Sequence, residues 1–319
     1  MTLERRAPRL GLVLGSGSAR GWAHIGVLQV LEEEGVRPDV VCGASIGALV
    51  GAAYAAGELD RFAKWVQSLG MREVFGFMDF RLSGGMLKGE KLIAFWRSHF
   101  ADFDIENSPL PFAAVATDLH SGAEVWLREG SIADAVRASI ALPGLFTPLQ
   151  LSDGRLLVDG GIVNPVPTSL ARAMGADIVM AVDLNADILH RHMQPLAVQG
   201  PQDVPEPVQA RPEENDAPGI PPEEPGWKER LRNWLPERAA RAEPPRTRPP
   251  SVLDVVMTSV AIMQMRITRS RMAGDPPEVV ISPSLAHLGL LDFHRAGEAI
   301  EEGRRAAREA LVQLHRFMQ

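Results

Sequence analysis

The chain has 319 residues, 45% of them hydrophobic, and a formal net charge of -7 at pH 7. This length suffices for one large core, and the negative charge opposes nucleic-acid phosphates, so we expect no nucleic-acid partner. The single cysteine, Cys42, excludes an internal disulfide, and the eight histidines show no paired spacing of zinc ligands. The N-terminus lacks the apolar core of a signal peptide. We therefore expect a cytoplasmic protein without a metal, and leave peripheral contact with the inner membrane open.

The first sixty residues alternate between strand and helix patterns. An apolar run at 10–14 ends in glycines and leads into helical spacing over 22–35. A second apolar run, at 40–42, turns at Gly43 into a helix that reaches Gly57. The uncharged segment 40–57 has the minimum length of a membrane span, but its Gly, Ala and Ser content favours a buried segment of a soluble fold. This alternation predicts an α/β fold of three layers, α/β/α, around a mostly parallel sheet.

The rest of the chain continues this pattern on both sides of a long interruption. Residues 186–250 contain 14 of the 25 prolines together with acidic runs, so we expect a disordered insertion that interrupts a single domain formed by 1–185 and 251–319. Apolar side chains at helical spacing near 227–235 lie beside basic residues, and for these both a membrane-surface helix and docking onto the domain remain open. Further strands are predicted at 112–116, 155–158, 177–184 and 279–281, and further helices at 90–99, 131–140, 165–174, 251–272 and 294–315.

The turn Gly43-Ala44-Ser45-Ile46-Gly47 joins a predicted strand to a predicted helix. A serine hydroxyl becomes a nucleophile only when its oxygen is exposed, its proton is accepted and the resulting oxyanion is stabilised. Glycines two residues on either side let the strand turn sharply, and the helix start adds N–H donors. Ser45 is therefore the predicted nucleophile of an ester hydrolase, while a helix entry chosen only for packing is the alternative.

The glycine-rich loop at 15–21 lies between the first strand and its helix. Its consecutive N–H groups predict an anion nest, which would face Ser45 if the first two strands pair. Dinucleotide binding is the competing interpretation, but Arg20 stands where the third glycine of that fingerprint belongs, with Gly21 one residue late. We therefore favour an oxyanion site.

Three motifs in this order resemble those of the patatin-like phospholipases: the loop with Arg20-Gly21, the turn around Ser45, and Asp159-Gly160-Gly161. The segments GWAHIGVL at 21–28 and ALPGLF at 141–146 are similar to the bacterial branch related to neuropathy target esterase. The resemblance covers 9–185 and 251–305. It implies a lipid ester substrate, no cofactor, and a catalytic dyad of Ser45 and Asp159 instead of a triad.

By the same resemblance, the oxyanion hole falls on Gly17 and Ser18, and the residues that support the motifs are Gly15, Arg20, Gly21, Gly43, Gly47, Gly160 and Gly161. Arg20 would either steady the loop or face a lipid phosphate. The chain departs from the family pattern where Ser16 and Ser18 replace glycines, and a serine is strained at any position that needs a positive φ.

Several alternatives remain open. A conventional triad would use one of the later histidines, and a structural role is expected for His24. Polar residues at predicted strand ends would serve structural hydrogen bonding before they serve the site. A lipid-sensing module without catalysis is the second functional class, and the oligomeric state is not predicted. The histidines in question are His190, His192, His287 and His294, and the strand-end residues are Thr117, Asp118 and Asp183.

Overall fold

The computed structural model describes residues 6–77, 90–100, 102–187 and 252–317. Segments from both sides of the gap at 188–251 form one compact unit. Residues 188–250 of the predicted insertion, including the apolar positions near 227–235, lie outside the described residues.

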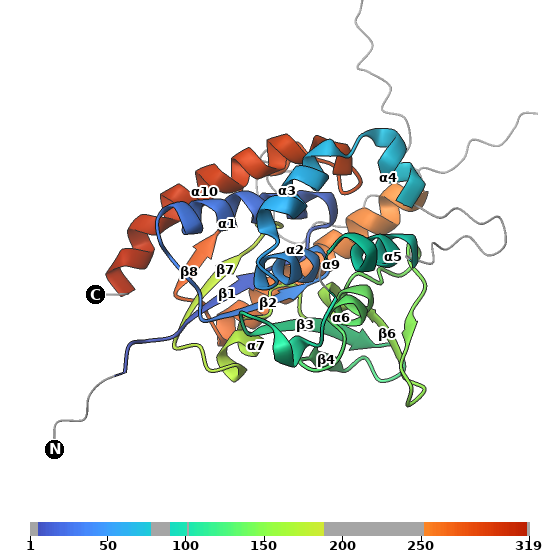
Figure 1. Cartoon of the computed structure of the whole chain (residues 1–319), viewed down its shortest axis with the longest axis horizontal. Coiled ribbons are helices and arrows are strands. Elements are labelled where there is room, and N and C mark those ends of the chain that lie inside the picture. The colour runs from blue at the N-terminus through green and yellow to red at the C-terminus, as the bar shows by residue number, and fades with distance from the viewer. Residues whose placement is uncertain (1–5, 78–89, 101, 188–251, 318–319) are drawn as a thin grey trace, which may run out of the picture. The chain divides into compact units, whose positions relative to one another are not determined.

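The described residues contain eight strands, which form one sheet (Figure 1). These are β1 (Leu10–Leu14), β2 (Val40–Ala44), β3 (Phe112–Asp118), β4 (Glu124–Leu127), β5 (Leu149–Gln150), β6 (Leu156–Asp159), β7 (Ile178–Val182) and β8 (Val279–Ile281). Five strands are parallel in the order β3-β2-β1-β7-β8, whereas β4, β5 and β6 pair antiparallel at the β3 edge. The central strands β1 and β2 are buried along their whole length, as parallel strands covered on both faces must be.

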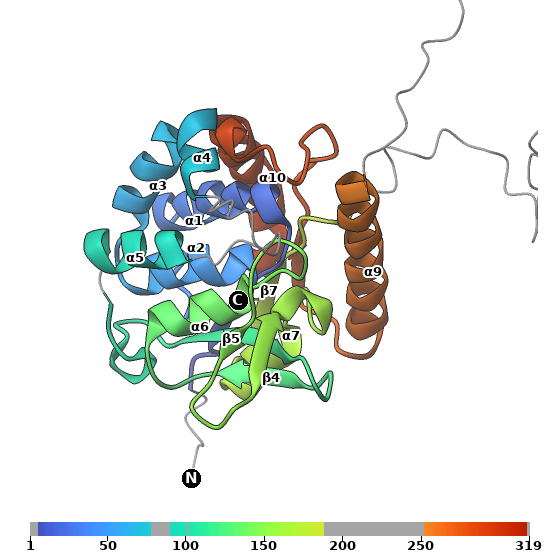
Figure 2. The same ribbon diagram turned by 90° about the vertical axis from the view of Figure 1, so that its right-hand side faces the viewer.

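Helices cover both faces of this sheet (Figure 2). The larger core lies between one face and α1, α2, α3, α5, α6 and α10, and the smaller core lies between the other face and α7. The predicted three-layer α/β/α architecture is therefore confirmed. The helices are α1 (Ala23–Glu33), α2 (Ile46–Ala55), α3 (Leu59–Ser68), α4 (Met71–Phe77), α5 (Glu90–His99), α6 (Ile132–Ser139), α7 (Thr168–Ala173), α9 (Val252–Gly274) and α10 (Ala296–Phe317), with short 3-10 turns η1 (Ser18–Trp22), η2 (Ile105–Asn107), η3 (Gly160–Ile162) and η5 (Phe293–Arg295).

The uncharged segment 40–57 forms β2 and α2, and nearly all of its residues are buried. This agrees with its interpretation as part of the protein core. Within the described ranges, none of the helices combines the length and apolarity needed to cross a bilayer.

Helices α1 and α10 come from opposite ends of the chain and pack closely against each other. Gly26 on α1 lies against the backbone of Ile300, and Gly303 on α10 lies against the carbonyl oxygen of Ala23. A Cβ atom at either glycine would overlap the backbone of the other helix. The C-terminal helix is therefore an integral part of the domain.

Candidate active site

Ser45 stands at the sharp turn between β2 and α2. Its backbone adopts φ 56° and ψ −126°, a conformation that costs an L-residue roughly 1 to 3 kcal/mol. The glycine at position 47 is needed because a Cβ there would overlap the carbonyl group of Leu14 at the end of β1. Backbone atoms also exclude a Cβ at Gly15, Gly43 and Gly160, whereas Gly21 lies against the side chain of Ile46 and Gly161 against that of Gln264.

Asp159 is the last residue of β6, and the sheet register brings it level with Ser45. Ala44 pairs with Val115, and the next residue of β3, Ala116, pairs with Asp159. The side chains of Ser45 and Asp159 therefore meet across β3. The Ser45 hydroxyl donates a hydrogen bond to Oδ2 of Asp159 at 2.5 Å. Oδ1 accepts a second hydrogen bond from the N–H of Gly161 at 2.7 Å. The two residues that the sequence singled out are therefore directly paired.

Asp159 is only 1% exposed to solvent. Burial disfavours the charged carboxylate and raises the pKa of Asp159 to about 7, although the hydrogen bonds from Ser45 and Gly161 lower it. A carboxylate with this pKa is a much better proton acceptor at neutral pH than an exposed aspartate. The environment thus supplies the desolvation that a Ser-Asp pair requires.

The loop after β1 lies beside Ser45 because β1 and β2 pair in parallel, as expected. Within the described ranges, the N–H groups of Gly17 and Ser18 have no hydrogen-bond acceptor, and both residues line the same pocket as Ser45. Ser18 has a φ of 54°, so the strain expected from serine in this loop is present there. The N–H groups that are already committed are those of Gly15, Ser16, Ala19 and Arg20.

Buried polar side chains hold this loop from behind. His24 donates from Nε2 to the carbonyl oxygen of Gly15 at 2.7 Å, and Asn185 donates to that of Ser16 at 3.2 Å. Burial lowers the pKa of His24 to about 4, so the ring is neutral at physiological pH. Arg20 is also buried, and its Nε donates to Leu288 O at 3.0 Å. Arg20 is absent from the pocket lining, which favours the loop-steadying role.

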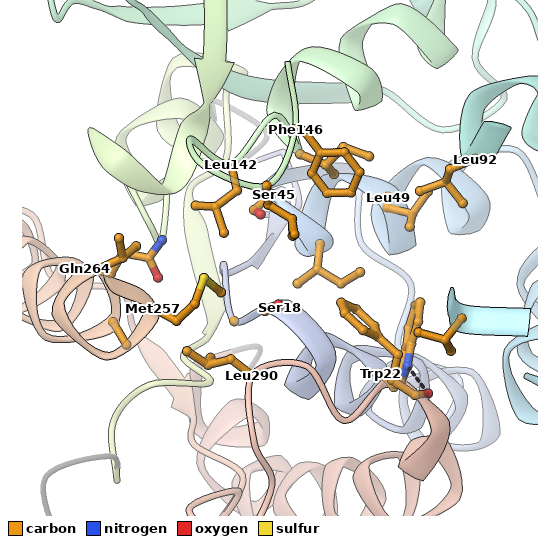
Figure 3. Close-up of a pocket in the computed structure, with 18 of the residues that line it drawn as sticks. Ser18, Trp22, Ser45, Leu49, Leu92, Leu142, Phe146, Met257, Gln264 and Leu290 are labelled. Carbon is orange, nitrogen blue, oxygen red and sulfur yellow. Dashed lines mark hydrogen bonds between the residues drawn. The ribbon is translucent and has the colours of Figure 1, made fainter. Parts of the chain in front are cut away.

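Ser45 opens into a pocket of about 1030 Å³, a volume that includes its open mouth (Figure 3). Its described lining carries no charged side chain, and apolar residues line it from α2, α5 and α9 and from the segment 140–146 that follows α6. The apolar lining consists of Trp22, Ile46, Leu49, Trp65, Leu69, Val74, Leu92, Ile140, Leu142, Leu145, Phe146, Met257, Val260, Ala261, Leu290 and Phe293.

Three polar residues support the site without having been singled out for it. The buried hydroxyl of Ser139 accepts from the N–H of Ser45 at 2.8 Å and donates to Val115 O at 2.6 Å. Thr117, expected to have a structural role, donates to the carbonyl oxygen of Asp159 at 2.8 Å. Gln264 on α9 is the polar residue that faces Ser45 from the opposite wall. Of these three residues, only Ser139 gives a signal in the sequence, because it is a polar residue near the apolar end of a predicted helix, shortly before the ALPGLF segment.

The remaining candidates lie away from the pocket. His287 and His294 are exposed, and the His287 ring lies 3.9 Å from Glu298, while His190 and His192 are outside the described residues. Asp118 caps a turn through His120 and Ser121, and Asp183 accepts from the N–H of Asn185. The described residues contain no group of three His, Cys, Asp or Glu side chains able to hold a metal. An uncharged, apolar pocket also does not suit the dinucleotide alternative.

Comparison with known proteins gives a matching family model, several relatives and a similar solved structure. A family model described as patatin-like phospholipase matches residues 12–172. An "Uncharacterized NTE family protein" of Mycobacterium tuberculosis is 35% identical over 331 aligned residues, covering 96% of this chain and 92% of the relative. Human "Patatin-like phospholipase domain-containing protein 6" is 39% identical over 184 residues, which are 56% of this chain and 13% of that protein. The crystal structure of VipD from Legionella pneumophila aligns with a TM-score of 0.34 and 17% identity over 57% of this chain and 55% of VipD.

Proposed function

Because the chain belongs to the patatin-like phospholipase family, which supports a lipid-hydrolase function, we propose that it hydrolyses carboxylic esters of phospholipids or lysophospholipids through an acyl intermediate on Ser45. The observation that carries this proposal is the 2.5 Å hydrogen bond from the Ser45 hydroxyl to buried Asp159, at the end of an apolar pocket. The pocket accepts the acyl chain, because an uncharged lining favours a hydrocarbon over a polar group.

In the proposed first step, Ser45 Oγ bonds to the ester carbonyl carbon while its proton passes to Asp159. The carbonyl oxygen becomes an oxyanion, which the uncommitted N–H groups of Gly17 and Ser18 stabilise. The bond to the alcohol then breaks, and Asp159 returns the proton to the leaving oxygen. A water molecule then attacks the carbonyl carbon of the acyl-Ser45 ester and gives its proton to Asp159. Asp159 passes the proton to Ser45 Oγ, which releases the fatty acid and restores the enzyme.

The proposal is tested with a fluorophosphonate probe followed by peptide mapping, together with turnover of a soluble chromogenic ester. We expect labelling at Ser45 in the wild type and loss of both labelling and turnover in Ser45→Ala, Ser45→Gly and Asp159→Asn. Glycine at position 45 tolerates the positive φ, so the Ser45→Gly variant separates lost chemistry from lost folding. Ser284→Ala, at an exposed serine far along the chain, is the matched control and keeps full activity.

Full turnover in Ser45→Ala or Asp159→Asn would contradict the dyad. A wild-type chain that binds lipid but does not label at Ser45 would instead support the alternative of a lipid-sensing module without catalysis.

A further inference from the structure

Helix α9 has two apolar faces, and only one of them is used by the domain. The inner face supplies Met257, Val260, Ala261 and Gln264 to the pocket wall. On the outer face, Val255, Val256, Ile262 and Met263 are exposed by 50, 43, 42 and 55%. We call these four side chains the outer stripe. In Figure 2, α9 stands at one side of the domain.

The outer stripe lies on one side of α9, with the exposed polar residue Ser259 between its two pairs of apolar side chains. Its members are separated by one, six, seven or eight residues, which places them on one side of a helix with 3.6 residues per turn. Arg266 lies three residues after Met263 and four residues after Ile262, and Arg269 lies three residues further along the helix. Both arginines are exposed. The same side of α9 is therefore apolar in its first half and cationic in its second.

We propose that α9 docks onto the surface of a lipid bilayer, with the outer stripe in the acyl boundary and Arg266 and Arg269 against anionic headgroups. The choice of a lipid surface rests on the proposed function, because the other face of this helix lines the pocket that would take the acyl chain. A bilayer held on the outer stripe therefore lies within a helix diameter, about 10 to 12 Å, of the pocket wall.

Charge supports a bilayer as the occupant. The helix carries three arginines (266, 269 and 271) and one aspartate (254), a net charge of +2, on a chain whose net charge is -7. Arg271 forms an ion pair with Glu124 at 3.0 Å, and Arg269 also interacts electrostatically with Asp183, whereas Arg266 is exposed on the outer side to external anions. Anionic lipids attract such a helix, although the chain as a whole is anionic.

Size argues against a second copy of the chain. A stable dimer interface needs roughly 20 to 30 residues on each side, whereas the outer stripe has four apolar side chains. An amphipathic helix at a membrane needs no such area, because a few apolar side chains and nearby cations suffice for reversible binding.

The test uses the single buried cysteine of the chain. Cys42 is fully buried and burial raises its thiol pKa, so it resists labelling in the folded protein. A polarity-sensitive fluorophore is attached through Met263→Cys on the outer stripe, and in a matched control through Val312→Cys, which is 63% exposed on α10. Both are made in the Ser45→Ala background, so that the lipid is not consumed during the measurement.

We expect the label at position 263 to shift to the blue with phosphatidylcholine vesicles that contain phosphatidylglycerol, and the label at position 312 not to shift. Without labels, Val256→Gln combined with Met263→Gln should weaken vesicle binding about tenfold or more, while Val312→Gln leaves it unchanged. Replacing Arg266 and Arg269 with glutamine should remove the preference for anionic vesicles.

Other results overturn the proposal. An absent shift at position 263, or equal shifts at both positions, excludes docking through this face. If the label at position 263 is blue-shifted without vesicles and the shift depends on protein concentration, the outer stripe binds a second copy of the chain. If that shift vanishes when residues 188–251 are deleted, the outer stripe binds that segment. Turnover of the soluble ester does not involve vesicles, so failure of the proposed function remains distinguishable from failure of docking.

Discussion

Asp159 is a buried carboxyl group whose pKa of about 7 lies well above that of an exposed aspartate. If Asp159 accepts the proton of Ser45, kcat/KM must follow the fraction of Asp159 that is deprotonated. A protonated carboxyl group is a far weaker base and does not take the serine proton. We expect kcat/KM for a soluble ester to rise with pH through about 7 and then level off. A profile that levels off near the ordinary aspartate pKa would contradict this assignment.

Ser139 accepts the hydrogen bond from the N–H of Ser45 but does not line the pocket. Removing its hydroxyl leaves the N–H of Ser45 and the carbonyl of Val115 buried without this partner, a cost of about 1 to 3 kcal/mol. We expect Ser139→Ala to lower kcat about tenfold to hundredfold with little change in KM, and to slow fluorophosphonate labelling of Ser45. Ser139→Thr keeps a hydroxyl and should recover part of the rate. A loss confined to thermal stability would assign Ser139 a purely structural role.

At the residue scale, the short motifs of the sequence predicted which residues lie together around Ser45. Ser45, Gly17 and Ser18 come together because the parallel strands β1 and β2 end at the same edge of the sheet, and Asp159 meets Ser45 across β3 from the antiparallel strand β6. Ser139 was not predicted, because its partners are backbone atoms of distant segments. Hydrogen bonds to the main chain leave only a weak signal in the sequence, which for Ser139 is a polar residue near an apolar helix end.

At the scale of elements, the apolar runs predicted the central parallel strands within one or two residues, because strands buried on both faces have unmistakable composition. The antiparallel edge was only partly predicted. Strands β4 and β5 are four and two residues long and only partly buried, so their composition resembles that of loops. Helix α3 was also not predicted, although its buried residues, Leu59, Phe62, Ala63 and Val66, follow helical spacing.

The crossing of α1 and α10 gives a stability prediction with an internal control. Gly303→Ala places a methyl group against the Ala23 carbonyl and should destabilise the protein by about 1 to 3 kcal/mol through overpacking. Gly297→Ala lies on the same helix in open space, and should be neutral or stabilise the protein by up to about 1 kcal/mol. Urea unfolding of both variants measures the difference. Equal effects at the two positions would show that the crossing is looser than the structure indicates.

At the scale of the whole molecule, two buried groups give the free energy of unfolding opposite dependences on pH. The pKa of Asp159 is raised to about 7, so its contribution is present at acid pH and is lost as the pH rises through about 7. The pKa of His24 is lowered to about 4, so its contribution is present above about 6.5 and is lost as the pH falls through about 4. Between about pH 4 and 6.5 the two slopes cancel.

Single substitutions should reveal each slope. Relative to the wild type, Asp159→Asn should gain stability as the pH rises, by up to about 4 kcal/mol, because the cost of ionising a buried carboxyl group is removed. In contrast, His24→Gln should gain stability as the pH falls, by up to about 3 kcal/mol. Urea unfolding across this pH range measures both. Variant curves that run parallel to the wild type would contradict the assigned burial effects.

The pocket is closed by two stretches of chain that lie far apart in sequence. Ser45, Asp159 and the loop after β1 fall inside the matched family segment 12–172, whereas Met257, Val260, Ala261 and Gln264 come from α9, beyond it. The proposed catalytic residues and much of the surface proposed to contact the acyl chain thus come from separate stretches of the sequence. An exchange of α9 between relatives, or a library confined to its inner face, would retune substrate choice while leaving the chemistry intact.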